Sequence, residues 1–355
     1  MNPTHSKTND SINVWILSDG LPGHFNQSYG ISEALNAQHT LNISTVDLHL
    51  RHKLLRPLMR AIAKKGSDKI IEFFLPIFYN FSLPSNKPAL IISAGGNSLY
   101  ANIALSKLKH SINCFSGTLK GYPNHLINIV FTVTPIKQCK NNIVLDLPPA
   151  KGSIKFKPGL KITGATGTQE KQEAPEKKFY ALLIGGEGAG YQYQKSDWLK
   201  LASEINHIAK KDNIQWLITT SRRTGHETET ILADNINKTI IKQAVWYGVK
   251  PEKVVHSFLM RAHKIFCTED SLSMVSEAIY SEKPVLTLQP EIFSPDENDS
   301  HALDQYQNRG FICRSPISQL SAMHQSDFKF TENYPQIDKE ICKALLPLLT
   351  QQKLM

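Results

Sequence analysis

The stretch CTEDSLSMVSEAIYSEKPVLTL sets carboxylates and hydroxyls between an apolar run and a helical pattern. Asp and Ser side chains at such a junction cap a helix by accepting hydrogen bonds from its first backbone N–H groups. Capping alone explains Asp270 or Ser271, but it leaves Thr268, Glu269 and Ser273 without a reason. A helix start also attracts an anion, because its N–H groups are free and its dipole is positive there. We therefore expect a diphosphate at this turn.

Glu277, further along the same predicted helix, extends this expectation to a nucleotide or a sugar, because a carboxylate accepts hydrogen bonds from a vicinal diol. Two more turns in this half of the chain suit an anion. GGEGAG at 185–190 lets backbone N–H groups approach one, although it fits no phosphate-loop motif in register and a plain Gly turn explains it equally. In SRRTG, Ser221 suits a helix cap, and Arg222 and Arg223 suit a phosphate or carboxylate; solvated surface arginines are the alternative.

The first half of the chain carries a different set in SDGLPGHFNQ at 18–27. Asp19 and His24 are each a candidate general base, because both are borne by a loop at a predicted strand end. A hydrogen-bonded loop residue is the alternative for each. SAGGNS at 93–98 is expected to complete the facing wall, unless it is a Gly turn with an Asn cap. The expected acceptor-side loop residues are Gly20, Gly23, Gln27, Gly95, Gly96 and Asn97.

Residues 51–83 combine a run of Lys and Arg with a following cluster of aromatic side chains. This pattern is typical of helices that lie on an anionic membrane surface. A helical hairpin whose aromatic residues pack into the core explains it equally, and Pro57 and Pro76 limit the length of either helix.

Strands and helices alternate along the chain, which predicts α/β units with parallel sheets and helices on both faces. Predicted strands begin near 12, 44, 87, 127, 141, 179, 214, 264 and 284. Predicted helices cover 25–35, 196–212, 226–240, 258–263, 272–282 and 337–352, and a further helix follows the Gly-rich turn within 87–109. The polar stretch 151–178 is the predicted linker. We expect two Rossmann-like doubly wound domains facing a central cleft, at 1–165 and 176–330, and a C-terminal helix within 331–355 that packs back on the first domain. Ligands of such sheets bind outside the carboxyl ends of the strands, where all the turns above fall.

Composition sets the outer limits. The 355 residues are 41% hydrophobic and 20% charged, which excludes a disordered or fibrous protein. A net charge of +9 favours an anionic partner. The five cysteines form no CxxC pair, so neither a disulfide framework nor a zinc site is expected. Without a signal-peptide pattern or a run of 18 apolar residues, we expect a cytoplasmic protein, at most peripheral on the inner face of the cytoplasmic membrane. Motifs of metalloproteases, α/β-hydrolases, metal-bridged transferases and calcium sites are missing, so no metal and no cofactor are expected.

The motifs DGLPGHFNQ, LLIGGEGAGYQY, TTSRRTG and TEDSLSMVSEAIYSEKPV, in this order, resemble the family named for the elongated-mitochondria fission factor of plants, over most of residues 12–315. That family in turn is similar to GT-B glycosyltransferases, whose second domain holds a nucleotide sugar. The resemblance implies a facing loop of Asp19, Gly23, His24 and Gln27. It implies a donor half of Gly185, Gly186, Ser221, Arg222, Arg223, Glu269, Asp270, Ser271, Ser273, Met274 and Glu277. The chain departs from the family after IISAG, where GNSLY replaces an arginine-bearing turn.

The leading hypothesis is a metal-independent GT-B-like glycosyltransferase that moves a sugar from a nucleotide-sugar to a lipid-linked or lipopolysaccharide-type acceptor at a membrane. Helix N–H groups and an arginine would neutralise the leaving group in place of a metal. Nucleic acid is not an expected partner. Two alternatives stay open: a non-catalytic scaffold on the same fold, and a nucleotide-sugar epimerase, which needs two or more carboxylates around the sugar ring.

Overall fold

A computed structural model describes residues 11–152, 178–326 and 328–353. The chain divides into two compact units: an N-terminal unit of Met1–Ile154 with Pro335–Met355, and a C-terminal unit of Lys155–Tyr334. The predicted linker at 151–178 lies almost wholly outside the described residues. Each unit is built on its own six-stranded sheet.

The N-terminal unit winds strands and helices in alternation. Its strands are β1 (Ile12–Ser18), β2 (Leu41–Asp47), β3 (His49–Leu50), β4 (Tyr79–Asn80), β5 (Leu90–Ala94), β6 (Ile112–Ser116), β7 (Ile129–Thr132) and β8 (Asn142–Val144). Its helices are α1 (Pro22–Asn36), α2 (Arg56–Lys65), α3 (Asp68–Phe78), α4 (Leu99–Lys109) and α11 (Ile337–Lys353), with short 3₁₀ turns η1 (Lys53–Leu55) and η2 (Asn124–Leu126). Pro22 starts α1, where its fixed φ and missing N–H cost nothing.

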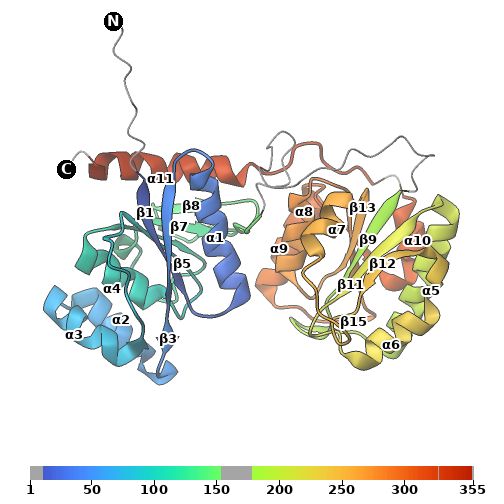
Figure 1. Cartoon of the computed structure of the whole chain (residues 1–355), viewed down its shortest axis with the longest axis horizontal. Coiled ribbons are helices and arrows are strands. Elements are labelled where there is room, and N and C mark those ends of the chain that lie inside the picture. The colour runs from blue at the N-terminus through green and yellow to red at the C-terminus, as the bar shows by residue number, and fades with distance from the viewer. Residues whose placement is uncertain (1–10, 153–177, 327, 354–355) are drawn as a thin grey trace, which may run out of the picture. The chain divides into compact units, whose positions relative to one another are not determined.

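The main sheet of this unit has the order β2-β1-β5-β6-β7-β8, with every pair parallel. The chain moves outward from β1 to β2 and then crosses to β5 on the other side of β1. The carboxyl ends of β1 and β5 therefore form a topological switch point, the place where such sheets bind ligands. Helices α1 and α4 cover opposite faces, and α11 packs on α1 (Figure 1).

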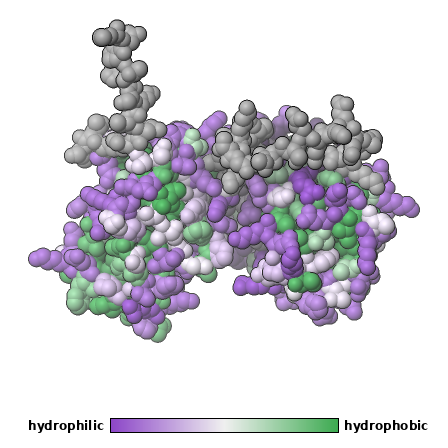
Figure 2. Space-filling view, viewed as in Figure 1, coloured by the Kyte–Doolittle hydropathy of each residue, from purple (hydrophilic) through white to green (hydrophobic). Residues whose placement is uncertain are grey.

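Helices α2 and α3 occupy the basic and aromatic region at 51–83, which the short β3–β4 ribbon closes. Both are amphipathic: one face, including Ile71, Leu75 and Phe78, is buried in the core. The other face of α3 leaves Phe73 66% exposed, and Leu54, in η1 just before α2, is 92% exposed. Figure 2 shows hydrophobic residues gathered at the lower left of the view, where Figure 1 places these helices. The hairpin interpretation thus holds for one face and leaves an apolar surface on the other.

The C-terminal unit repeats the plan. Its strands are β9 (Phe179–Ile184), β10 (Tyr191–Gln192), β11 (Gln215–Thr220), β12 (Ile241–Val245), β13 (Lys264–Thr268), β14 (Val285–Gln289), β15 (Ile292–Phe293) and β16 (Cys313–Pro316). Its helices are α5 (Lys195–Asp212), α6 (His226–Asn235), α7 (Val255–Arg261), α8 (Leu272–Tyr280), α9 (Glu297–Asn308) and α10 (Leu320–His324), with 3₁₀ turns η4 (Lys238–Ile240) and η5 (Ile317–Gln319).

The main sheet of this unit is also parallel and has the order β12-β11-β9-β13-β14-β16. Its switch point lies between β9 and β13, and α8 begins there. Helices α5 and α6 cover one face of the sheet, and α8 and α9 lie on the other (Figure 1). The predicted α/β class with two parallel, doubly wound sheets is confirmed.

Some predicted elements differ from the structure. The helix expected over 226–240 ends at Asn235, and the following residues form η4 and the edge strand β12. The helix expected at 258–263 starts earlier, at Val255. Strands β6 and β16 and helix α9 were not predicted. Each of these segments carries polar residues that interrupt the apolar pattern.

Candidate functional site

The switch point of the N-terminal unit holds a His–Asp pair. Asp19 follows β1, and its carboxylate lies 2.9 and 3.1 Å from Nδ1 of His24 in α1. Asn97, from the turn after β5, donates its side-chain N–H to Asp19 Oδ2 at 3.1 Å. The backbone N–H of Leu21 donates to Asp19 Oδ1 at 3.3 Å. The Asp19 side chain is only 2% exposed, whereas that of His24 is 33% exposed.

These contacts assign different roles to the two candidate bases. The Asp19 carboxylate already accepts hydrogen bonds from its neighbours, so it holds the proton on Nδ1 of His24. The Nε2 atom of His24 is then left with its lone pair, on a side chain that solvent reaches. This is the arrangement in which an imidazole takes a proton from a substrate hydroxyl.

Gly95 is required beside this pair. Its φ is +78°, and a Cβ at this position would lie 2.1 Å from the His24 ring. Gly96 lies in the same turn, and Gln27 accepts a hydrogen bond from Ser116 Oγ at 2.9 Å at the end of β6. Gly20 turns the chain after β1 at φ +78°, whereas a Cβ on Gly23 would meet nothing. The predicted loop residues therefore gather at one sheet edge, and Gly23 has no packing role there.

In the C-terminal unit a buried ion pair joins three strand ends. Asp270, which follows β13, accepts from Arg223 Nη2 at 2.5 Å and from the Gly186 N–H at 3.1 Å. Burial raises the pKa of Asp270 above its usual range, against the lowering effect of Arg223. A Cβ on Gly185 would lie 2.1 Å from the Asp270 carboxylate, so this position has no room for another residue. Thr268 accepts from the Gly185 N–H at 2.7 Å.

Glu269 is committed to internal partners, although the sequence placed it in the donor site. Arg314 Nε and Nη2 each donate to its carboxylate at 2.9 Å, forming a bidentate pair. Thr287 donates at 2.6 Å and Tyr191 at 3.0 Å. Glu269 is 1% exposed, so its function is to hold β13, β14 and β16 together. Sequence reasoning missed Arg314 because it lies 45 residues away in the chain.

The start of α8 is partly exposed to solvent: Ser271 is half-buried and Ser273 is exposed. Ser271 is its N-cap and accepts from the Met274 N–H at 3.4 Å, and the hydroxyls of Ser271 and Ser273 lie 3.1 Å apart. The N–H groups of the first helical turn, at Leu272 and Ser273, have no carbonyl of the helix to bind. Arg222, exposed on the neighbouring turn after β11, forms no ion pair with any residue that the structure describes.

Glu277 lies one turn further along α8. Burial raises the pKa of its carboxyl group to about 7. In the described parts of the chain no hydrogen bond or charged group offsets this effect, and the side chain is half-buried. A partly buried carboxylate without a partner costs stability, and such groups concentrate at functional sites.

Ser221 does not cap a helix, since α6 starts after Gly225; its Oγ donates to the Gly185 carbonyl at 2.9 Å instead. Sequence reasoning did not select two neighbouring polar residues, Thr224 and Glu229. Thr224 Oγ1 donates to the Ile184 carbonyl at 3.2 Å. The carboxylate of Glu229 accepts from the Gly248 N–H at 3.0 Å and fixes the turn after β12. These contacts anchor neighbouring turns at the carboxyl ends of β9, β11 and β12.

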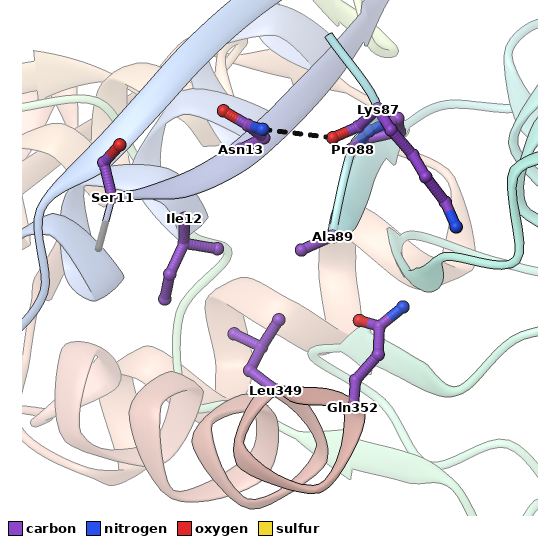
Figure 3. A pocket seen from close by; sticks show the side chains of 8 residues that line it. All are labelled: Ser11, Ile12, Asn13, Lys87, Pro88, Ala89, Leu349 and Gln352. Atoms are coloured by element: carbon purple, nitrogen blue, oxygen red, sulfur yellow. Dashed lines mark hydrogen bonds between the residues drawn. The ribbon is translucent and has the colours of Figure 1, made fainter. Parts of the chain in front are cut away.

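A cavity of about 290 Å³ lies at the opposite, amino end of β1 and β5 (Figure 3). Asn13 donates to the Lys87 carbonyl there at 3.2 Å, and Leu349 and Gln352 of α11 line the other side. Its lining holds no acid, thiol or imidazole. The groups suited to chemistry are therefore those at the carboxyl ends.

Within the described ranges, no helix combines the length and hydrophobicity needed to cross a bilayer. No three His, Cys, Asp or Glu side chains gather as metal ligands in the same part of the chain.

Two α/β units, each built on a parallel, doubly wound sheet with a topological switch point, define a protein with a GT-B-type fold. Among solved structures, UDP-GlcNAc 2-epimerase from Methanocaldococcus jannaschii has this fold, with 12% identity, 96% of this chain and 99% of that chain covered, and a TM-score of 0.52. The ADP-heptose lipopolysaccharide heptosyltransferase II of E. coli matches at 13% identity, 96% and 100% coverage and a TM-score of 0.43.

The family model of Mitochondrial fission ELM1 matches residues 160–331, which confirms the predicted resemblance over this range. An uncharacterised protein of Rickettsia prowazekii (strain Madrid E) is 21% identical over 313 residues, covering 80% of this chain and 85% of the relative.

Proposed function

We propose that the chain is a metal-independent glycosyltransferase that takes a sugar from a nucleotide-sugar donor. The observation that carries the proposal is that the two switch points hold different kinds of chemical group. One holds an imidazole oriented by a carboxylate, and the other holds an open helix start followed by the unpartnered carboxylate of Glu277. A transfer reaction needs both a base for the acceptor and a site for the leaving group.

The reaction follows from these groups. His24 Nε2 takes the proton of an acceptor hydroxyl, whose oxygen then attacks the anomeric carbon of the donor sugar. The bond between that carbon and the diphosphate oxygen breaks, and the nucleotide leaves with the electron pair. The free N–H groups at the start of α8 and the exposed Arg222 stabilise the developing negative charge. Arg223 takes no direct part, because Asp270 already binds it.

The contacts favour a transferase over the epimerase alternative. An epimerase needs two or more carboxyl groups around the sugar ring, and of the acids selected from the sequence Glu277 alone has no partner in the described part of the chain. Asp19 and Glu269 each accept several internal hydrogen bonds, and Asp270 is bound by Arg223. The similarity to the epimerase structure extends to the fold alone.

Nucleotide binding tests the proposal against a scaffold function. Calorimetric titration of the full chain with UDP, GDP, ADP and CMP at pH 8 is expected to find one nucleotide that binds. Because Glu277 loses its charge as the pH falls through about 7, the affinity is expected to fall between pH 8 and 6. In Glu277→Gln the affinity should be about 10–100-fold weaker at pH 8 and independent of pH, because a hydrogen bond to a charged group is lost.

The 2′-deoxy form of the bound nucleotide provides the matched control, because it lacks one hydroxyl of the diol and should bind parent and variant alike. Glu277→Gln should also unfold at a higher temperature than the parent at pH 8. The raised pKa means that the carboxylate form destabilises the fold above pH 7 and has no such effect near pH 4. Failure of all four nucleotides to bind would leave the scaffold as the better interpretation.

We further propose that the acceptor lies at a membrane surface, to which the protein binds peripherally. The outward side of α2 and α3 exposes Leu58, Ile70, Phe73 and Ile77 among lysines, a combination that suits an anionic bilayer. Leu54→Ser/Phe73→Ser is expected to reduce co-sedimentation with phosphatidylglycerol vesicles by at least tenfold, on the order of the apolar area lost.

Val249, which is 71% exposed in the C-terminal unit, supplies the control for that experiment. Val249→Ser should leave vesicle binding unchanged. Equal binding of the parent to neutral phosphatidylcholine vesicles would contradict the electrostatic part of the interpretation.

A further inference from the structure

A second cavity lies beside the His–Asp pair of the N-terminal unit. It has a volume of about 460 Å³, within the range of small-molecule sites. Helix α2 contributes Arg56 and Arg60, the loop after β6 contributes Lys120 and Tyr122, and His24 lies in the same lining. The lining contains no carboxylate.

The cations of this cavity lack acidic partners. Arg56, Arg60 and Lys120 form no ion pair with any Asp or Glu in the described ranges of the chain. Positive charges that share a cavity repel one another, and an anion in the cavity removes that cost. The phenol of Tyr122 is buried beside them: burial raises its pKa to about 12 although Arg60 and Arg56 act to lower it.

The backbone is shaped to bring these cations together. Lys120 has φ +48° and Gly121 has φ +84°, two successive left-handed residues in the loop after β6. Arg60 Nη1 donates to the Lys120 carbonyl at 3.4 Å. Arg56 and Arg60 are four residues apart in α2 and therefore share one face of the helix. A left-handed non-glycine residue is uncommon and is often found at ligand sites.

A chain of hydrogen bonds links the cations to the base. Arg56 Nη2 donates to Asn97 Oδ1 at 2.5 Å, and Asn97 Nδ2 donates to Asp19 Oδ2 at 3.1 Å. Asp19 in turn holds His24. Tyr79 fixes the same turn by donating to the Asn97 carbonyl at 2.6 Å. An anion held by Arg56 is thus positioned relative to the imidazole by side chains that bind one another directly.

We propose that this cavity is the acceptor subsite and that it selects a sugar carrying a carboxylate or a phosphate. The arginines and Lys120 bind the anionic group, and a hydroxyl of the same sugar then lies at His24. The inference rests on the proposed glycosyltransferase function and adds the chemical class of the acceptor. It also gives the basic residues of α2 two separate roles, since Lys64 and Lys65 are exposed and do not line the cavity.

Ligand-observed NMR on the full chain tests the subsite with glucuronate, glucose 6-phosphate, glucose and glycerol 3-phosphate. We expect at least one of the two anionic sugars to bind and glucose not to bind. Arg56→Gln/Arg60→Gln should weaken that binding about 10–100-fold, because charge-assisted hydrogen bonds are lost. The matched control, Lys64→Gln/Lys65→Gln, removes the same charge from the same helix and should bind like the parent.

Absence of binding by both anionic sugars, or an equal loss in the lysine control, would overturn the proposal. Equal affinity for glycerol 3-phosphate and glucose 6-phosphate would also overturn the proposal, because it would mean that the cavity binds the phosphate group and does not recognise the sugar. Nucleotide affinity, measured in parallel, should not change in either variant. Nucleotide binding without binding of an anionic sugar would reject the subsite alone, and the reverse result would reject the proposed donor site alone.

Discussion

Replacement of His24 by Ala is expected to lower the rate of sugar transfer by about 10²–10⁴-fold, the range typical for loss of a general base. In the proposed mechanism the Nε2 lone pair of His24 accepts the proton, because Asp19 holds the other ring nitrogen at 2.9 Å. Asp19→Asn should lower the rate less, since the imidazole stays but its favoured tautomer is no longer enforced. The rate to measure is the release of nucleotide from a nucleotide-sugar whose nucleotide is the one that binds in calorimetry.

Two controls keep this result interpretable. Nucleotide affinity should not change in either variant, because the base and the diphosphate site belong to different units. His39→Ala, at an exposed histidine after α1 in the same unit, should leave the rate unchanged. Full activity of His24→Ala and Asp19→Asn, with nucleotide still bound, would remove the dyad from the mechanism.

Arg314→Leu is expected to cost about 3–5 kcal/mol of the free energy of unfolding, because it leaves a buried carboxylate without its cation. Glu269 is 1% exposed and receives two hydrogen bonds of 2.9 Å from this side chain. The remaining partners, Thr287, Tyr191 and Gln289, are neutral and cannot compensate for the charge. Urea denaturation with a fluorescence readout measures the change.

The double variant Glu269→Gln/Arg314→Leu tests whether the loss of stability comes from the unpaired buried charge or from the missing Arg314 contacts. It should recover part of the lost stability, since burying an amide costs less free energy than burying an unpaired carboxylate. Lys200→Leu is the matched control, because its i,i+4 pair with Glu204 is more exposed and is worth well under about 1 kcal/mol. A loss in Arg314→Leu no larger than in Lys200→Leu would contradict this description of β13, β14 and β16.

Much of the fold could be predicted because interior parallel strands read as apolar runs. The segments that became β1, β5, β9, β13 and β14 were identified in this way. Strands β12 and β16 lie at sheet edges, where half-exposed polar residues interrupt the pattern. Strand β6 is interior but carries Asn113, whose amide bonds to Asn102 and Ser106 inside the unit.

The turns of the candidate site could be predicted one by one, but their partners could not. The alternation of strands and helices places each polar turn at a carboxyl end of a sheet. Which side chain each turn binds is a tertiary property: Arg223 meets Asp270 across 47 residues, and Arg56 meets Asn97 across 41. The sequence therefore predicted Asp270 as a ligand-binding residue, whereas the structure pairs it with Arg223. It also left open whether Asp19 or His24 is the base; the hydrogen bonds of Asp19 support our proposal that His24 has this role.

The return of α11 to α1 makes the C-terminal unit an insertion within the N-terminal one. Ile341 and Leu345, near the end of the chain, are almost fully buried, and Cys342 donates to the Ala34 carbonyl of α1 at 3.2 Å. A premature stop codon after the last strand would therefore damage the half of the protein that was synthesised first. During synthesis the surface of α1 in the N-terminal unit is covered only after α11 has been made. The C-terminal unit is complete before that point.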